Sequence, residues 1–369
     1  MSDNLRVYRA VHQALHQLYP TEPKGDFARH LTTLAMFICG IVQSRKSQLP
    51  ALASKVPDGN RPPSRIKRFV RWLKNGRVTA EAFYLPFATI LLNALPGPLV
   101  LVIDSSEVGD GCCTWIVSVI YRKRALPLVW TVANRPKGHA SDDEHLQLLN
   151  AVQPLLPQGR TVIFLGDGEF EGVPVQAALS EWGWEYVLRT AKNRQIGEVF
   201  GDDDLWFSFR QLAVVPGETL WIEDARFTKA GFGPVLVVAT WPADLDEVVY
   251  LVSNMETAGE ACFWYRKRFR IETFFSDQKS RGFHLHQSHL SDPERLARLM
   301  IGTCLAYLWI VFLGVKAKHE GWQKHLHRKG RCDWSLFRLG LALLDELLNR
   351  CLDIPVFLSP PLYLSKSVR

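Results

Sequence analysis

The chain has 369 residues, of which 47% are hydrophobic and 22% charged, an ordinary globular composition long enough for two or more domains. The net charge of +7 is uneven: residues 1–98 carry 14 Lys and Arg against 5 Asp and Glu, or +9, and the remaining residues carry 30 against 32, or −2. Seven cysteines without a C-x-x-C pair argue against a zinc site or a disulfide framework. The sequence begins without a signal-peptide pattern, so we expect a cytoplasmic protein with reduced thiols.

The basic N-terminal part, residues 1–98, is predicted to be helical. Its helical spacing and turn residues place helices at 5–18, 27–42, 49–56, 65–74 and 78–95, the last with a possible kink at Pro86. Ser64 is a plausible N-cap for the fourth helix, because the prolines before it prevent extension backwards.

The helix at 65–74 carries five cations and no acid. Together with the preceding helix and turn it resembles a helix-turn-helix arrangement, which predicts contact with nucleic acid; the alternative is a solvated basic face. The cations of this helix are Arg65, Lys67, Arg68, Arg71 and Lys74.

Residues 99–190 mix strands with helices. Strands are expected at 99–103, 114–121, 125–132, 161–165 and 184–189, and helices at 143–152 and 173–182. Short connections between the first three strands favour a mixed sheet over a parallel dinucleotide-binding sheet, and no G-x-G-x-x-G motif follows the first strand. The first and fourth strands each run into an aspartate, Asp104 and Asp167 respectively.

Residues 191–256 interrupt this pattern. Strands are expected at 220–227, 234–241 and 248–252. The segment carries 5 cations and 11 acids, and this acidity makes it a poor general clamp for DNA.

The stretch 265–279 contains no Gly or Pro, so a single helix can run through it. At 100° per residue, Tyr265, Arg268, Glu272 and Lys279 fall within about 60° of one another on one face. We expect Ile271 and the nearby Phe274 to face a core. The alternative for the polar face is a solvated row of ion pairs, since Arg268 and Glu272 are i,i+4 partners.

The spacing Tyr, two residues, Arg, three residues, Glu, six residues, Lys resembles the Y-R-E-K signature of bacterial insertion-sequence transposases of the DDE class. The two upstream aspartates occur in the order that this family requires, and the resemblance covers roughly residues 99–310. It implies an α/β fold: a ribonuclease-H-like mixed sheet as catalytic core, a β-rich insertion and a helical N-terminal DNA-binding domain. It also implies a cut-and-paste transposase that acts as a homodimer on its terminal inverted repeats.

The resemblance further implies that Asp104, Asp167 and Glu272 hold two Mg²⁺ ions, for which Mn²⁺ would substitute, with Asp104 bridging them. Glu107, Asp110 and Glu169 lie near enough in sequence to replace one of these ligands. Tyr265, Arg268 and Lys279 would contact the DNA phosphates. The insertion would help to hold the transposon end, with Trp206, Trp221 or Trp241 as a base-stacking candidate unless these side chains are core residues.

The remaining C-terminal sequence carries three weaker signals. Histidines 284, 286 and 289 could suggest a metal site but are interpreted as a loop. The uncharged run 299–315 is at the lower limit for a membrane span and is predicted to be a buried core helix. A basic stretch at 324–331 and a helix at 334–351 are predicted to serve DNA contact or subunit association.

The predicted organisation is therefore a helical DNA-binding domain at 1–98, a catalytic core at 99–190 and 257–319, an insertion at 191–256 and a helical region at 320–369. Two other functions remain open: another ribonuclease-H-like nuclease such as a junction resolvase, and a non-catalytic DNA-binding protein derived from a transposase.

Overall fold

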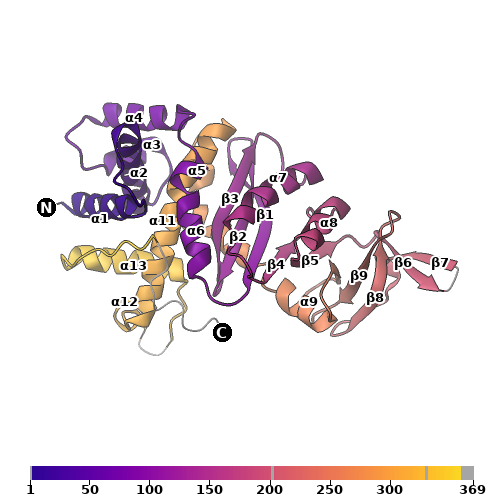
Figure 1. The fold of residues 1–369 in the computed structure, drawn as a ribbon. Coiled ribbons are helices and arrows are strands. Elements are labelled where there is room, and N and C mark those ends of the chain that lie inside the picture. Colours follow the sequence, from indigo (N-terminus) through magenta and orange to yellow (C-terminus); the bar gives the residue numbers. More distant parts are fainter. Residues whose placement is uncertain (1, 201–202, 329–330, 359–369) are drawn as a thin grey trace.

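The computed structural model describes residues 2–200, 203–328 and 331–358. Within these residues, one ten-stranded sheet runs from the centre of the molecule to one end, in the order β3-β2-β1-β4-β5-β10-β9-β8-β6-β7. Most helices gather at the other end, around the N-terminus (Figure 1). The strands are β1 Leu99–Gly109, β2 Cys112–Tyr121, β3 Arg124–Ala133, β4 Val162–Gly166, β5 Glu185–Thr190, β6 Gln195–Phe200, β7 Asp203–Ser208, β8 Thr219–Phe227, β9 Phe232–Thr240 and β10 Val249–Ser253.

The first five strands form the ribonuclease-H-like mixed sheet that the sequence predicts. β1, β2 and β3 pair antiparallel, whereas β4 pairs parallel with β1 and β5 parallel with β4. The crossovers into β4 and β5 contain α7 (Asp142–Val152) and α8 (Val173–Glu181). Because β1 and β4 are parallel neighbours, their carboxyl ends lie at the same edge of the sheet.

β1 is longer than the predicted strand at 99–103. Its pairing with β4 ends at Val102, but β2 continues to pair with it as far as Gly109. Asp104 therefore lies inside a strand, two residues beyond the last pairing with β4. The hydrogen bonds from β2 keep its backbone extended and rigid.

The insertion continues the main sheet, because β10 pairs antiparallel with β5. β8, β9 and β10 match the three predicted strands closely. The hairpin of β6 and β7 was not predicted, since charged residues interrupt its short apolar runs.

The N-terminal and C-terminal helices pack together around one long helix, α11, which contacts α2, α4, α13 and β3. α11 and α13 cross closely at two glycines: a Cβ on Gly314 would lie 1.8 Å from the carbonyl oxygen of Leu336, and one on Gly340 1.8 Å from that of Ile310. The helices of this end are α1 Asp3–Gln17, α2 Gly25–Ser44, α3 Leu49–Ser54, α4 Pro62–Lys74, α5 Ala80–Phe83, α6 Leu85–Ala94, α11 Pro293–His319, α12 Gln323–Leu326 and α13 Leu336–Asn349.

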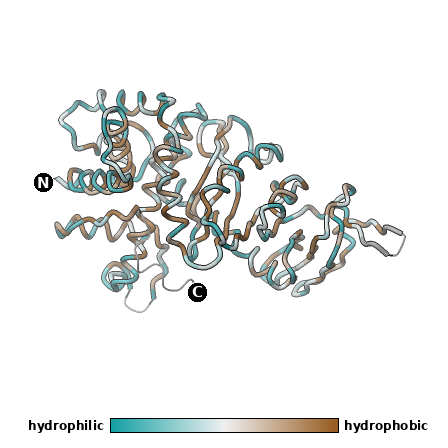
Figure 2. The backbone as a smooth tube through the Cα atoms, viewed as in Figure 1, coloured by the Kyte–Doolittle hydropathy of each residue, from teal (hydrophilic) through white to brown (hydrophobic). Residues whose placement is uncertain are grey.

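α11 confirms the prediction of a core helix at 299–315. It is long and apolar enough to cross a membrane, yet 89% of its most apolar window is buried inside the fold. Figure 2 shows it as a hydrophobic segment enclosed by other elements.

Two details of the N-terminal helices differ from the prediction. α4 begins at Pro62, so the prolines occupy its first turn and Ser64 is not its N-cap. The helix expected at 78–95 is two helices, α5 and α6, that break at Tyr84. Tyr84 is fully buried and its hydroxyl donates to the carbonyl oxygen of Pro127 at 2.5 Å. This contact with β3 fixes the break.

Candidate active site

Asp104 lies at the carboxyl-end edge of the sheet with a side chain that is only 6% exposed. One carboxylate oxygen accepts hydrogen bonds from the Ser105 amide at 2.8 Å and from Lys137 Nζ at 3.0 Å. The other oxygen lies 3.4 Å from a guanidinium nitrogen of Arg268. A buried carboxylate is costly unless it is paired, and here two cations pair with it.

Asp167 follows β4 directly, beside Asp104 on the neighbouring strand. Its carboxylate accepts a hydrogen bond from the Glu169 amide at 3.0 Å. Burial and the negative charge of Asp104 raise the pKa of Asp167, against the opposing effects of that amide, Arg268 and Lys137. Because these two carboxylates repel each other, a cation bound between them would stabilise their charged forms.

The stretch 265–279 is not the single helix that its composition predicts. α9 (Ala258–Tyr265) and α10 (Arg270–Gln278) are separated by a turn in which amides bond three residues back, such as Arg268 to Tyr265 at 2.9 Å. In this turn Arg268 is buried against Asp104, and its guanidinium stacks 4.6 Å from the Phe269 ring. The tertiary contact with Asp104 outweighs the local preference for a continuous helix.

Arg268 connects Asp104 with Glu272. Its second guanidinium nitrogen lies 3.3 Å from Glu272, whose side chain on the first turn of α10 is 57% exposed. Burial would lower the pKa of Arg268, but the nearby Tyr265, Asp104, Asp167 and Glu272 outweigh it and raise the pKa. Arg268 is therefore a fixed positive charge between the carboxylates.

The other two signature residues also point to this edge of the sheet. Lys279, at the end of α10, donates to the Ser106 hydroxyl at 2.7 Å, two residues beyond Asp104 on β1. Tyr265 is buried beside Arg268, with 6.0 Å between its ring centre and the guanidinium carbon. Ile271 and Phe274 of α10 are buried, as predicted.

Comparison with protein families gives a match over the sequence that contains this site. Residues 96–309, more than half of the chain, match the family described as "Transposase DDE domain". The chain belongs to this family. Its members generally use divalent metal ions.

Among solved structures, the DDE-domain chain is similar to the piggyBac transposase in a cryo-EM structure of its synaptic complex with hairpin DNA. The two are 11% identical with a TM-score of 0.46, over 97% of this chain and 81% of that one. No curated protein matches the chain.

The DDE-domain carboxylates suit a hard divalent cation by type, since Mg²⁺ prefers oxygen ligands and Asp104 already attracts two positive side chains. In this arrangement Arg268 lies between Asp104 and Glu272. Among the described residues, no three His, Cys, Asp or Glu side chains are grouped closely enough to hold one ion. The three histidines after Lys279 form no such group either. His284 precedes a short 3₁₀ turn, η3 (Leu285–Gln287), and His286 lies within it.

Three further side chains surround the carboxylates. Lys137, in the loop after β3, is half exposed, and Asp104, Asp167 and Glu169 raise its pKa despite the opposing effect of burial. Glu169 accepts hydrogen bonds from Ser105 at 2.6 Å and from Trp115, and the buried His145 lies 3.8 Å from it.

Glu169 was a candidate from its position two residues after Asp167. Lys137 and His145 were missed, because nothing in their local sequence links them to a carboxylate on β1 or to Glu169.

A groove of about 640 Å³ leads from Asp167 toward the insertion. Trp241 lines it together with Arg189 of β5 and Lys192. Of the other two candidates for base stacking, Trp206 is half-buried and packs on Gly197, and Trp221 is 53% exposed. None of the three is a fully buried core residue, and only Trp241 lines this groove.

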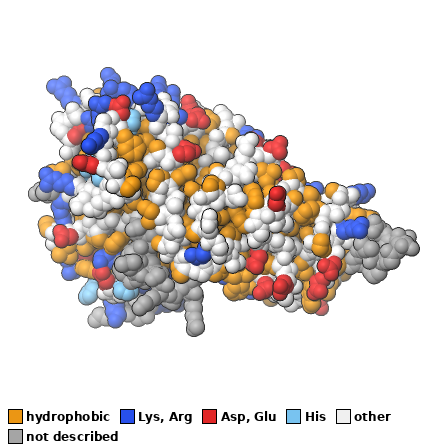
Figure 3. All heavy atoms as spheres, viewed as in Figure 1, with side chains coloured by type: hydrophobic (Ala, Val, Ile, Leu, Met, Phe, Trp, Pro, Cys, Tyr) orange, Lys and Arg blue, Asp and Glu red, His pale blue; other side chains and the backbone are white. Residues whose placement is uncertain are grey.

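The predicted DNA-binding cations of α4 fall into two groups. Arg65 and Arg68 are paired with Asp58 at 2.5 and 2.8 Å, so the acid absent from the helix is supplied by the turn before it. Lys67, Arg71 and Lys74 are exposed. Figure 3 shows Lys and Arg side chains gathered where α4 lies in Figure 1, and Asp and Glu side chains toward the insertion.

Proposed function

We propose that this chain is a DNA transposase of a bacterial insertion sequence, which binds terminal inverted repeats, cleaves them and joins the ends to target DNA. The observation that carries the proposal is the meeting of Asp104, Asp167 and Arg268 at one edge of a DDE-domain sheet, with Glu272 held by Arg268. The Y-R-E-K spacing supports an insertion-sequence origin.

In this proposal Asp104, Asp167 and Glu272 are the residues that would hold two Mg²⁺ ions. When bound, such ions supply an activated water and stabilise charge on the phosphate. Arg268 must then release Glu272 and turn toward a DNA phosphate, which its guanidinium can clamp through two hydrogen bonds. Lys137 donates to Asp104 and Lys279 donates to Ser106, and both lysines would position the phosphates that flank the cut.

The DNA would extend from this edge in two directions. The exposed cations of α4 suit a sequence-independent contact with the duplex backbone. In the groove beside Asp167, Trp241 would stack on a base of a displaced end while Lys192 faces the backbone. Arg189 is paired with Glu247, which also lines the groove, so it would have to leave this carboxylate before it could contact a phosphate. A homodimer would hold two such ends together.

The test is cleavage of a labelled duplex that carries the protein's selected binding site, in Mg²⁺ or Mn²⁺. Asp104→Asn, Asp167→Asn and Glu272→Gln should each reduce cleavage by about 10³-fold or more, because each removes a charged ligand from the reacting centre. DNA affinity should change by less than about twofold. Asp110→Asn is the matched control, because Asp110 is exposed in the turn after β1, six residues along from Asp104, and is therefore not expected to act as a ligand.

Full activity in any of the three variants would remove that residue from the site. Cleavage confined to four-way junctions would favour a resolvase, and binding without cleavage by the unmodified protein would favour a non-catalytic DNA-binding protein.

A further inference from the structure

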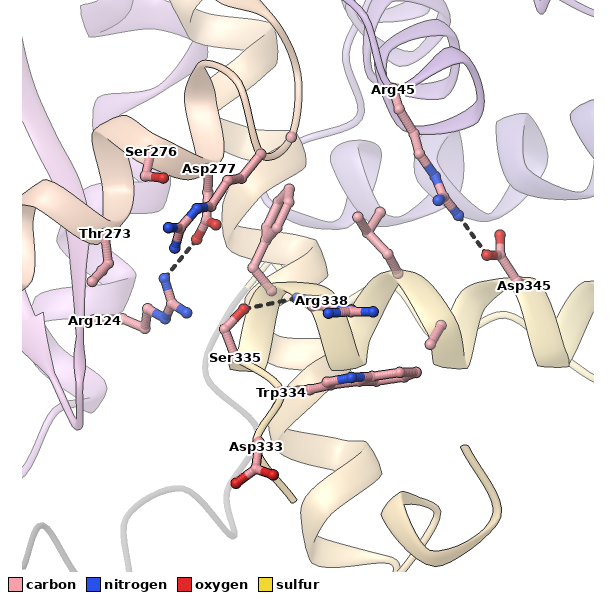
Figure 4. Close-up of a pocket in the computed structure, with 15 residues that line it drawn as sticks. Arg45, Arg124, Thr273, Ser276, Asp277, Asp333, Trp334, Ser335, Arg338 and Asp345 are labelled. Carbon is pink, nitrogen blue, oxygen red and sulfur yellow. Dashed lines mark hydrogen bonds and ion pairs between the residues drawn. The ribbon is translucent and has the colours of Figure 1, made fainter. Parts of the chain in front are cut away.

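A second cavity, of about 740 Å³, lies where α10, α13, α2 and the start of β3 meet. Figure 4 shows it from within: Thr273, Ser276 and Asp277 project from α10, and Trp334, Ser335 and Arg338 lie at the start of α13. Its size is in the range of small-ligand sites. No part of the site around Asp104 lines it.

The cavity has an excess of positive charge. Four arginines and three aspartates line it. Arg124 pairs with Asp277 at 2.6 Å, Arg45 pairs with Asp345, and Asp333 pairs with Arg331, which is outside the cavity. The two remaining guanidinium groups, of Arg281 and Arg338, form no ion pair among the described residues, although the charge of Arg281 acts to lower the pKa of Asp277.

These two arginines have hydrogen-bond donors available for an anion. The Arg338 guanidinium lies 4.4 Å from the centre of the Trp334 ring and is stacked against it (Figure 4). Stacking fixes the plane of a guanidinium but leaves its edge free to donate hydrogen bonds. Ser276 adds a hydroxyl to the lining without a hydrogen-bond partner of its own in the described part of the chain. Two guanidiniums outside ion pairs and a hydroxyl are donors of the kind that recognise a phosphate.

The cavity is linked to the candidate active site through α10. Ser276 is four residues after Glu272 on α10, so both lie on nearly the same face, about 6 Å apart along the helix axis. We propose that Arg281 and Arg338 bind a backbone phosphate of the DNA strand that passes Glu272, and so hold this strand at a second point. The inference rests on the proposed function for its ligand; the charge and shape of the cavity specify only a phosphate group.

The experiment measures equilibrium binding, with the full-length Asp104→Asn protein in Ca²⁺, so that cleavage does not interfere. The DNA is the selected site with single methylphosphonates placed one by one along the strand. At one position, loss of the charge should weaken binding about tenfold, the effect of losing a charge-assisted contact. In the variant that also carries Arg281→Gln and Arg338→Gln, unmodified DNA should bind about tenfold more weakly, and the methylphosphonate at that position should have no further effect.

Arg350→Gln is the matched control, because Arg350 lies at the far end of α13 and pairs with Glu346. It should keep the tenfold methylphosphonate effect. If the effect is as large in the double arginine variant as in the control at every position, the proposal is wrong. Thermal unfolding of each variant establishes that it folds.

A second arm separates DNA from free phosphate as the ligand. If millimolar pyrophosphate without DNA raises the melting temperature of the protein but not of the double arginine variant, the cavity is a small-anion site and the strand assignment fails. Failure of the proposed function would be a separate result, because it would appear as absent metal-dependent cleavage by the unmodified protein.

Discussion

Basic side chains occur in two settings in this molecule. On α4, Lys67, Arg71 and Lys74 are exposed to solvent and have no acidic partner among the described residues. At the sheet edge, Lys137 and Arg268 each contact Asp104. An exposed cation can meet a DNA phosphate without any change in the protein, whereas a paired cation must first leave a carboxylate. The comparison therefore predicts separate effects: α4 should govern affinity, and the paired cations should govern chemistry and stability.

The largest effect is expected from a paired cation. Arg268→Ala leaves the buried Asp104 with Lys137 as its one charged partner and removes a phosphate clamp. We expect the first-strand nick to fall about tenfold and the later step to fall about 10³-fold, since that step requires the DNA end to be held. A time course that resolves nicked from fully cut DNA, across a Mg²⁺ titration, measures both. A defect that disappears at high Mg²⁺ would show that Arg268 supports the metal site instead.

The exposed cations should act on binding alone. The triple change of Lys67, Arg71 and Lys74 to Gln should weaken DNA binding about 100-fold at moderate salt, and should reduce the slope of log affinity against log salt by about 3, for three lost phosphate contacts. Thermal stability should not change. The measurement is fluorescence anisotropy at several salt concentrations. An unchanged salt slope would mean that α4 does not lie on the DNA.

The buried ion pair of Arg124 and Asp277 should make the free energy of unfolding depend on pH. Burial raises the pKa of Asp277 to about 6, although Arg124 and Arg281 oppose this. The folded state therefore binds more protons than the unfolded state between the two pKa values, and the contribution of Asp277 to stability falls as pH rises from about 4 to 6. The loss is at most about 3 kcal/mol. Urea unfolding at pH 4 to 7 should show this decline, and Asp277→Asn should remove it, whereas the exposed Asp345→Asn should not.

The smallest effects are expected from single changes that compare a paired cation with an exposed cation on α4. Arg65 is paired with Asp58 and both side chains are largely buried. Arg65→Gln should lower the free energy of unfolding by about 1–2 kcal/mol, because it leaves Asp58 with one cation. DNA affinity should change by less than about twofold. Lys67→Gln, on the same helix, should show the reverse: unchanged stability and weaker binding. If the two changes weakened DNA binding equally, the distinction between paired and exposed cations on α4 would be wrong.

Much of the fold was predictable from local sequence. Hydrophobic runs gave the positions of β1, β4 and β8 to β10, and the short connections after β1 and β2 predicted antiparallel pairing. The two aspartates were candidates because an apolar run leads into each of them and the Y-R-E-K resemblance requires two upstream acids; the structure places Asp104 inside β1 and Asp167 directly after β4. These predictions succeed because the period of a strand and the breaks between elements depend on neighbouring residues.

Other features were decided by residues far apart in the chain. The signature stretch contains only residues that a helix tolerates, yet the chain turns sharply at Arg268. The turn lets the Arg268 guanidinium reach the buried Asp104 carboxylate on β1, and this ion pair outweighs the preference for a straight helix. For the same reason, Asp58 pairs with two of the five cations of α4. Lys137 reaches Asp104 from a loop without any local signal.

The amino-acid sequence by itself therefore determined the order of the strands along the chain and the presence of a buried helix at α11, whereas the assignment of the acidic residues as metal ligands stays a prediction. Only the tertiary structure decided which cations are paired and which are free, because the energy of a charge depends on the solvent and the countercharges around it. Those surroundings are assembled from β1, β4, the turn before α10 and the loop after β3, and no single stretch of sequence contains them.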